Sequence, residues 1–284
     1  MSADGWHRSW PAPAKLNLFL HVVGRREDGY HLLQSAMRLI DCCDQVRFSP
    51  LRTSRIALAK PLQDVEESRE LCVRAARLLQ AQTGCQNGVE IRIDKNIPMG
   101  GGLGGGSSDA ATTLMVLNRL WNLGLDRSRL MGLGLQLGAD VPFFIFGQSA
   151  FAEGIGERLA PITLPAAWYL VLVPPVSVST QEVFATLNLT QNTKSIKISS
   201  FSVGFGRNDL ESAVCRRYPV VARYLGWLKA YGDARMSGSG ACVFTEFSTE
   251  AQARAVASRL PPEMRGFVAR GLERHPVEEG LDAG

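Results

Sequence analysis

Leucine or valine stands at every second position over residues 15–23, with other side chains between them. This alternation is the period of a strand with one buried face. We therefore expect a half-buried strand in which Lys15 and Asn17 project from the same face. Asp28-Gly29 marks a turn, and residues 31–48 are expected to form a second extended segment.

The remaining pattern predicts helices that alternate with strands. Apolar spacing and helix-end residues predict helices over residues 67–82, 107–121, 128–137, 180–187, 209–217, 219–231 and 250–260. Apolar runs and alternation predict strands over residues 89–94, 168–173, 241–247 and 266–270. A polar loop is expected over residues 188–200 and a frayed tail over residues 278–284. Because the pattern restarts after about residue 160, the simplest organisation is two α+β domains, residues 1–160 and 161–284.

Composition and charge narrow the class of protein. Of 284 residues, 45% are hydrophobic and 20% charged, which excludes wholesale disorder. The formal net charge of +4 suits an anionic small molecule, and the chain lacks the clustered basic residues typical of nucleic-acid binding. The longest apolar runs, residues 141–146 and 168–173, are far shorter than the roughly 20 residues of a membrane-spanning helix. Residues 1–10 lack an apolar signal region, so we expect a cytoplasmic protein with no membrane partner.

The six cysteines form no C-x-x-C pair, and the four histidines are scattered along the chain. A zinc site is therefore not expected. In a reducing compartment the cysteines are expected to be free thiols, several of them in the core.

A glycine-rich loop follows the strand expected over residues 89–94. Six of the seven residues from Gly100 to Gly106 are glycine, which lets backbone N–H groups turn toward one point. The next helix directs its positive end to the same point. The loop is thus expected to hold a polyphosphate, with Ser107 and Ser108 available to cap the helix or contact a metal ion. A flexible linker is the weaker interpretation, because a strand precedes the loop and a small-residue helix start follows it.

Three types of phosphate-binding motif compete for this loop. A Walker A loop needs a lysine that is absent here, and the protein-kinase strings His-Arg-Asp and Asp-Phe-Gly do not occur. Gly100, Gly102 and Gly105 match G-x-G-x-x-G formally. The first strand of a dinucleotide-binding fold is apolar on both faces, whereas residues 89–94 alternate with charged side chains. None of the three motifs therefore fits.

Other positions carry groups suited to chemistry, and each has two interpretations. Asp140 lies between a glycine and an apolar run. It could be a general base, or it could be a solvated loop carboxylate or a cap for the next turn before Pro142. Lys15 could stabilise charge on a transferring phosphoryl group or protect an edge strand. Tyr30 and His31 could receive a nucleobase, or they could be ordinary hairpin residues. All three questions stay open at this level.

A second glycine turn, residues 236–244, leads into the strand expected over residues 241–247. Its backbone N–H groups could approach a nucleotide or substrate. It could also be no more than a tight turn between a helix and a strand, and the two interpretations are compatible.

Three segments resemble, in this order, the three motifs of the GHMP kinases, which include galactokinase, homoserine kinase and mevalonate kinase. They are residues 11–18, 98–111 and 236–244. The resemblance implies an α+β two-domain GHMP-kinase fold, with an N-terminal ribosomal-protein-S5-like domain and a C-terminal ferredoxin-like α/β-plait domain. It also implies an ATP-dependent kinase for a small-molecule alcohol, using Mg²⁺. The N-terminal domain would bind the ATP phosphates and carry the catalytic residues.

Within this superfamily, the chain resembles the branch that phosphorylates the 2-hydroxyl of a cytidine diphosphate-linked methylerythritol in the non-mevalonate isoprenoid pathway. The segments that carry this resemblance are residues 14–20, 26–31, 98–108, 137–142 and 151–157. The resemblance spans about residues 9–271. It implies a small-molecule partner, no nucleic acid, and a monomer or weak homodimer.

The resemblance also implies roles for individual residues. Asp140 would be the general base and Lys15 its partner, Asn17 would help to hold the substrate, and Tyr30, His31 and Phe184 would receive the cytosine. The ATP phosphates would lie on Pro98, Met99, Gly100, Gly101, Gly102, Leu103, Gly104, Gly105, Gly106, Ser107 and Ser108. The magnesium ligands stay unassigned.

Two positions depart from the related kinases. Arg69-Glu70-Leu71 stands where they usually have an asparagine before the leucine, on the adenine side of the site. Residues 127–130 lack the carboxylate that some members offer to magnesium.

The alternatives are another GHMP small-molecule kinase, a non-catalytic ligand sensor on the same fold and an RNA-binding protein. The run Asp28-Gly29-Tyr30-His31 disfavours the first, because those substrates carry no base. Intact Lys15, Asp140 and glycine loop disfavour the second, and the absence of a basic stripe with interleaved aromatics disfavours the third.

Overall fold

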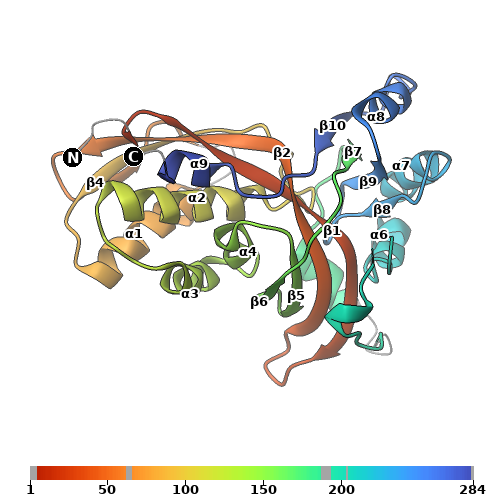
Figure 1. Cartoon of the computed structure of the whole chain (residues 1–284), viewed down its shortest axis with the longest axis horizontal. Coiled ribbons are helices and arrows are strands. Elements are labelled where there is room, and N and C mark those ends of the chain that lie inside the picture. Colours follow the sequence, from red (N-terminus) through yellow and green to blue (C-terminus); the bar gives the residue numbers. More distant parts are fainter. Residues whose placement is uncertain (1–4, 62–65, 187–192, 203, 283–284) are drawn as a thin grey trace.

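The computed structural model describes residues 5–61, 66–186, 193–202 and 204–282, and in these ranges the strands form two sheets (Figure 1). The first sheet has the order β3-β4-β2-β5-β6, with β1 paired to β2, and the second has the order β10-β7-β9-β8. The strands of the first are β1 (Ser9–Arg25), β2 (His31–Leu51), β3 (Ile56–Leu58), β4 (Gly88–Asp94), β5 (Ala150–Gly154) and β6 (Arg158–Pro161). Those of the second are β7 (Trp168–Leu172), β8 (Arg235–Met236), β9 (Val243–Phe247) and β10 (Gly266–Arg270). The predicted α+β class is thus confirmed, while the boundary at residue 160 stays a prediction.

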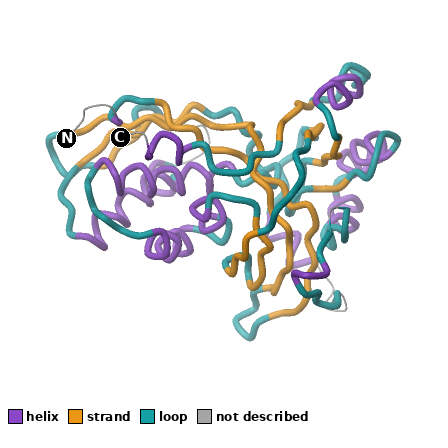
Figure 2. Tube along the Cα trace, viewed as in Figure 1, coloured by secondary structure: helices purple, strands orange, loops and turns teal. Residues whose placement is uncertain are grey.

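Helices cover one face of the first sheet, as Figure 2 shows. They are α1 (Leu71–Thr83), α2 (Gly105–Leu120), α3 (Arg127–Leu137) and α4 (Val141–Phe146). Their apolar side chains form one core with strand residues such as Trp10, Phe48 and Ile91. The helices α5 (Thr180–Thr186), α6 (Glu211–Arg217), α7 (Pro219–Lys229) and α8 (Glu250–Ala257) belong to the second half. No helix in the described ranges has the length and apolar character needed to cross a bilayer.

Strand β1 is buried on both faces, so the expectation of a half-buried strand is wrong. Lys15 and Asn17 do share a face, because Lys15 Nζ donates a hydrogen bond to Asn17 Oδ1. That face is turned toward the cavity and Asp140, while the opposite, apolar face of β1, with Leu16 and Leu18, packs in one cluster with Tyr169 and Phe244 of the second half. The free edge of β1 is covered too: Leu20 N donates to Arg207 O at 3.0 Å and Asp209 N donates to Leu20 O at 2.8 Å. The alternation of apolar residues predicts the strand, but it does not predict which other segments bury its polar face.

Several element boundaries differ from the prediction. Helix α1 begins only at Leu71, because the Glu70 carboxylate accepts a hydrogen bond from Val73 N and caps it, and the residues just before form a 3₁₀ turn (Glu67–Arg69). Helix α2 begins two residues earlier than expected. The sequence reasoning missed α4, β3, β5, β6 and β8, which are six residues or shorter. Short segments of this kind give too few periods to be recognised.

The ends of two predicted segments lie outside the described residues. The helix expected to reach residue 187 is described to Thr186. Of the loop expected over residues 188–200, residues 188–192 are not described, and the last three form a 3₁₀ turn (Ile198–Ser200). The described cysteines are free thiols as expected, and Cys72 and Cys242 are buried.

The frayed tail is the clearest error. Helix α9 (Val277–Asp282) contacts α2 and β1, and Val277 is fully buried, although residues 283–284 are not described. His275 holds this segment in place, because its backbone N–H donates to Gly147 O at 2.7 Å and its ring Nδ1 accepts from Val277 N at 3.2 Å. Tertiary contacts, which local composition does not report, order the tail.

Burial of the His275 imidazole makes the stability of the protein depend on pH. Desolvation lowers the pKa of His275 from 6.5 to about 3, so the imidazole is neutral in the folded state. The unfolded chain takes up a proton near pH 6.5, and stability is therefore lost as the pH falls from 6.5 toward 3. At pH 5 we expect this group to lower the unfolding free energy by about 2 kcal/mol relative to pH 7, measured by urea titration.

His275→Gln removes the titrating group and should flatten this part of the pH dependence. Exposed His7 provides the control, since His7→Gln should retain the wild-type slope. Equal losses between pH 7 and pH 5 for wild type and His275→Gln would show that His275 is not the origin.

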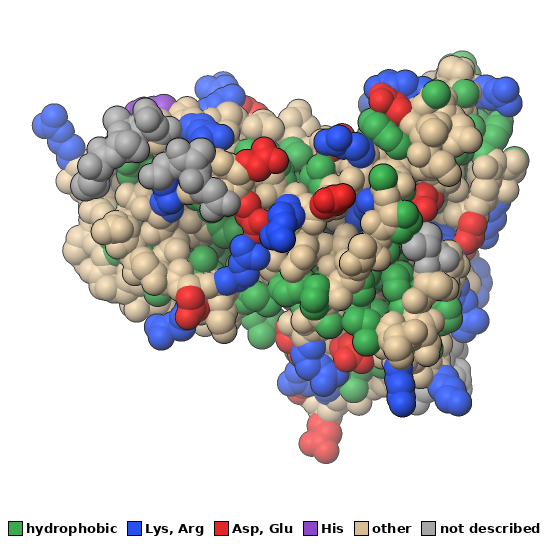
Figure 3. Space-filling model, viewed as in Figure 1, with side chains coloured by type: hydrophobic (Ala, Val, Ile, Leu, Met, Phe, Trp, Pro, Cys, Tyr) green, Lys and Arg blue, Asp and Glu red, His purple; other side chains and the backbone are tan. Residues whose placement is uncertain are grey.

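The charge on the outer surface is mixed. Lys and Arg side chains on the face in Figure 3 are scattered and stand among Asp and Glu side chains. This face therefore carries no single charged stripe among the described residues.

Candidate active site

A cavity of about 540 Å³ lies where the two halves of the chain meet. The first half supplies the glycine loop, residues of β1 and β2, and Asp140. The second half supplies Thr180 and Phe184 of α5 together with the second glycine turn at Gly238–Gly240. Segments far apart in the sequence thus face one shared cavity, which is the usual setting of a small-molecule site.

The glycine loop lines this cavity from Pro98 to Ser107. Gly102 has φ of 76°, and a Cβ there would lie 2.2 Å from the carbonyl oxygen of Ser237, so only glycine fits at this crossing of the two turns. Lys15 N donates to Leu103 O at 2.9 Å and ties the loop to β1. The first N–H groups of α2 have no partners within the helix, and they follow the loop directly. This arrangement suits bound phosphate groups.

Ser108 lies apart from the other predicted loop residues. It does not line the cavity, it is fully buried, and its hydroxyl has no hydrogen-bond partner among the described residues. Ser107, half-buried at the cavity wall, is the hydroxyl that faces the open space.

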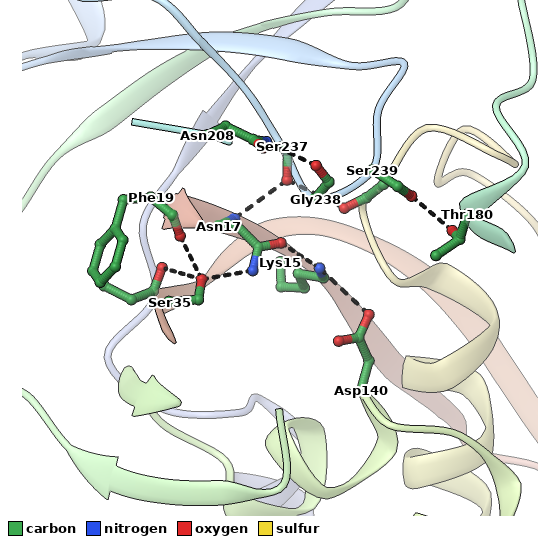
Figure 4. A network of polar contacts seen from close by, with 12 residues as sticks. Lys15, Asn17, Phe19, Ser35, Asp140, Thr180, Asn208, Ser237, Gly238 and Ser239 are labelled. Carbon is green, nitrogen blue, oxygen red and sulfur yellow. Dashed lines mark hydrogen bonds and ion pairs between the residues drawn. The ribbon is translucent and has the colours of Figure 1, made fainter. Parts of the chain in front are cut away.

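Lys15 and Asp140 face each other across the cavity (Figure 4). Lys15 Nζ lies 3.4 Å from Asp140 Oδ2, and the side chains are 4% and 34% exposed. Lys15 Nζ also donates to Asn17 Oδ1. The Asp140 carboxylate is therefore open to a ligand, while Asn17 holds the Lys15 ammonium group.

The second glycine turn supports both β1 and the first loop. The Ser237 hydroxyl accepts from Asn17 N and donates to Gly102 O, both at 3.2 Å. Asn208 Nδ2 donates to Met236 O and Gly238 O, both at 2.7 Å. The turn is thus more than a connection between elements. Asn208 was missed because only the tertiary structure brings it to residues 236–238.

Of the three residues expected to receive the cytosine, only Phe184 lines the cavity. The His31 ring stacks on the Phe184 ring with centroids 5.0 Å apart and an interplanar angle of 27°. Burial, and then the charge of Arg25, lower the pKa of His31, so its imidazole is neutral near pH 7. Tyr30 is 61% exposed and lies outside the cavity.

A buried charge cluster lies behind the glycine loop. Lys95 Nζ donates to the carboxylate of Asp44 and, at 2.7 Å, to Asp109 Oδ2. Asp44 Oδ1 also accepts from the N–H groups of Asn96 and Ile97, which lead into the loop. Burial raises the pKa of Asp109 to about 8, and Lys95 acts against this rise. Sequence reasoning missed the cluster, because its members lie on three separate segments.

The cavity offers magnesium few protein ligands. Ser107 and Asp140 present oxygen atoms at its wall, the ligand type that Mg²⁺ prefers. The described residues contain no group of three or more His, Cys, Asp or Glu side chains placed to hold a metal ion. The cavity wall therefore fits a magnesium ion that keeps its bound waters and is held mainly by phosphate oxygens.

Comparison with known proteins agrees with this geometry. The family model "GHMP kinases N terminal domain" matches residues 70–148, and "GHMP kinases C terminal" matches residues 194–265. A protein of Thiobacillus denitrificans named 4-diphosphocytidyl-2-C-methyl-D-erythritol kinase is 60% identical over 95% of this chain and 97% of its own length. A protein of the same name from Nitrosospira multiformis is 59% identical over 95% of this chain and 93% of its own length.

Solved structures of GHMP kinases share the fold of this chain. A crystal structure of 4-(cytidine 5'-diphospho)-2C-methyl-D-erythritol kinase superposes with a TM-score of 0.82 at 34% identity, covering 93% of this chain and 99% of that one. The mevalonate kinase of Methanococcus jannaschii shares the fold, with a TM-score of 0.65 at 15% identity over 95% of this chain and all of its own. Two matched family models, near-complete coverage by the relatives and a shared fold lead to one conclusion: this chain belongs to the GHMP kinases.

Proposed function

We propose that this chain transfers the γ-phosphoryl group of ATP to the 2-hydroxyl of 4-diphosphocytidyl-2-C-methyl-D-erythritol. The observation that carries the proposal is the Lys15–Asp140 pair, 3.4 Å apart, facing the glycine loop within one cavity. A base, a cation and a phosphate cradle are the parts that a small-molecule kinase needs. The names of the relatives, at 59–60% identity, support this particular alcohol.

Asp140 acts as the general base in this proposal. Its carboxylate accepts the proton of the 2-hydroxyl as that oxygen attacks the γ-phosphorus. Lys15, nearly buried, keeps Asp140 oriented and stabilises negative charge on the transferring phosphoryl group. Since both groups act mainly through position, the hydrogen bonds that hold them matter as much as their charges.

The glycine loop holds the ATP phosphates. Its backbone N–H groups and the start of α2 face the cavity, so the triphosphate is oriented by backbone dipoles rather than by a loop lysine. Ser107 is the residue that would hold Mg²⁺ beside the ATP phosphates, and the bound ion would supply positive charge against the phosphate oxygens.

The cytidine end of the substrate binds at His31 and Phe184, with Tyr30 closing the outer side. The neutral imidazole can donate from one nitrogen and accept at the other, and Phe184 offers a ring face for stacking. At a centroid distance of 5.0 Å the two rings touch each other. A base can therefore stack on Phe184 only if His31 and Phe184 part or the outer ring face is used.

We expect His31→Ala to raise the KM for the cytidylyl substrate about 10-fold, because a stacking and hydrogen-bonding partner is lost. The KM for ATP should stay within about two-fold of the wild type, since His31 does not line the cavity near the glycine loop. Steady-state kinetics with each substrate varied in turn measure both values. An unchanged KM and Kd for the cytidylyl substrate would remove His31 from this role.

The proposed function is tested by ADP release from purified protein with MgATP and four alcohols in parallel. These are 4-diphosphocytidyl-2-C-methyl-D-erythritol, mevalonate, homoserine and galactose. We expect turnover with the first alone. Turnover with another alcohol would contradict the proposed substrate but leave the kinase assignment, and ATP binding without any turnover would favour a ligand sensor.

A further inference from the structure

A line of hydrogen bonds runs behind the Lys15–Asp140 pair (Figure 4). Lys15 Nζ donates to Asn17 Oδ1, Asn17 Nδ2 donates to Ser35 Oγ at 2.8 Å, and Ser35 Oγ donates to Phe19 O at 2.5 Å. Ser35 lies on β2, opposite Leu20 of β1 and Ala152 of β5, and is only 2% exposed. Sequence reasoning passed over this serine, which is one small polar residue in a long strand.

The direction of this line is determined at both ends. A backbone carbonyl can only accept and an ammonium group can only donate. Because the Ser35 hydroxyl gives its proton to Phe19 O, its oxygen can only accept from Asn17. The Asn17 amide must then turn its NH₂ group toward Ser35 and its oxygen toward Lys15.

The backbone of Asn17 is held separately, since its N–H donates to the Ser237 hydroxyl. The remaining freedom of Asn17 is the rotation of its carboxamide. A rotated carboxamide would present NH₂ to the Lys15 ammonium, which is buried and needs an acceptor. Ser35 excludes this orientation.

We propose that Ser35 is a positioning residue for phosphoryl transfer, which acts through Asn17 and Lys15 on Asp140. The inference rests on the proposed function. Ser35 keeps the Asn17 oxygen against Lys15 Nζ, and this contact holds the ammonium group 3.4 Å from the Asp140 carboxylate. Without it, Lys15 loses its buried acceptor and moves away from the proposed base.

Ser35→Ala removes the hydroxyl and little else. We expect kcat to fall about 10-fold, because a small displacement of catalytic groups is costly. The KM for ATP should stay within about two-fold, since Ser35 does not contact the glycine loop. Ser35→Thr keeps a hydroxyl and should restore most of kcat, while Ser149→Ala, at a buried serine of the same half, should leave kcat unchanged.

A double-mutant cycle separates positioning from general structural damage. If Ser35 acts through Asn17, Ser35→Ala should lower kcat about 10-fold in the wild type but have no further effect in Asn17→Ala. Equal losses in both backgrounds would overturn the proposal.

A crystal structure of Ser35→Ala gives a test that does not depend on turnover. We expect the Asn17 oxygen to lie beyond hydrogen-bond distance of Lys15 Nζ, and an unchanged contact would overturn the proposal. If the wild type does not turn over the cytidylyl substrate, the proposed function fails while this structural test still decides the role of Ser35.

Discussion

We expect Asp140→Asn to lower kcat by a factor of about 10²–10⁴, the usual contribution of a general base. Asparagine has nearly the same shape and still offers an oxygen to Lys15 Nζ, which lies 3.4 Å from the carboxylate in the wild type. Folding and ATP binding should therefore be preserved, and only the capacity to take a proton is lost. Steady-state ADP release gives kcat, calorimetry gives the Kd for ATP, and thermal unfolding checks the fold.

The matched control is Asp126→Asn. Asp126 caps α3 by accepting from Arg129 N at 2.7 Å, and it does not line the cavity. Asparagine is an equally good cap, so this variant should keep the wild-type kcat and stability. If Asp140→Asn retains full turnover, the proposed base is some other group.

We expect Lys95→Met to lower the unfolding free energy by about 3–5 kcal/mol, because removal of one member of a buried ion pair leaves an uncompensated charge. Lys95 is the cation of a cluster in which the Asp44 side chain is 0% and the Asp109 side chain 2% exposed. Methionine replaces the length of the side chain without the charge. Urea titration measures the loss.

The same variant should raise the KM for ATP, because Asp44 also accepts from the two N–H groups that lead into the glycine loop. Arg47→Met is the control, since the Arg47–Asp94 pair is more than one-third exposed on both sides. A pair of that kind contributes about 0–1 kcal/mol. Similar losses for Lys95→Met and Arg47→Met would contradict the importance of burial at Lys95.

Much of the site could be predicted because it depends on local pattern. The glycine loop, the shared face of Lys15 and Asn17, and the position of Asp140 before an apolar run all follow from neighbouring residues. The α+β class follows in the same way. These features depend on periods and turns that a short window of sequence contains.

The rest could not be predicted because it depends on distant contacts. Ser35 matters through a strand 18 positions away in sequence, and Lys95 through partners 51 and 14 positions away. Helix α9 is ordered by the buried Val277 and by His275, whereas its composition suggests a loose end. Burial of β1 on both sides has the same origin.

The shared edge of β1 has a consequence for motion. The second half bonds to this strand through backbone groups at Leu20, and Arg235 Nη1 donates to Leu18 O at 2.7 Å. A hinge rotation of one half against the other would break these bonds, so the two halves are expected to stay fixed relative to each other along β1.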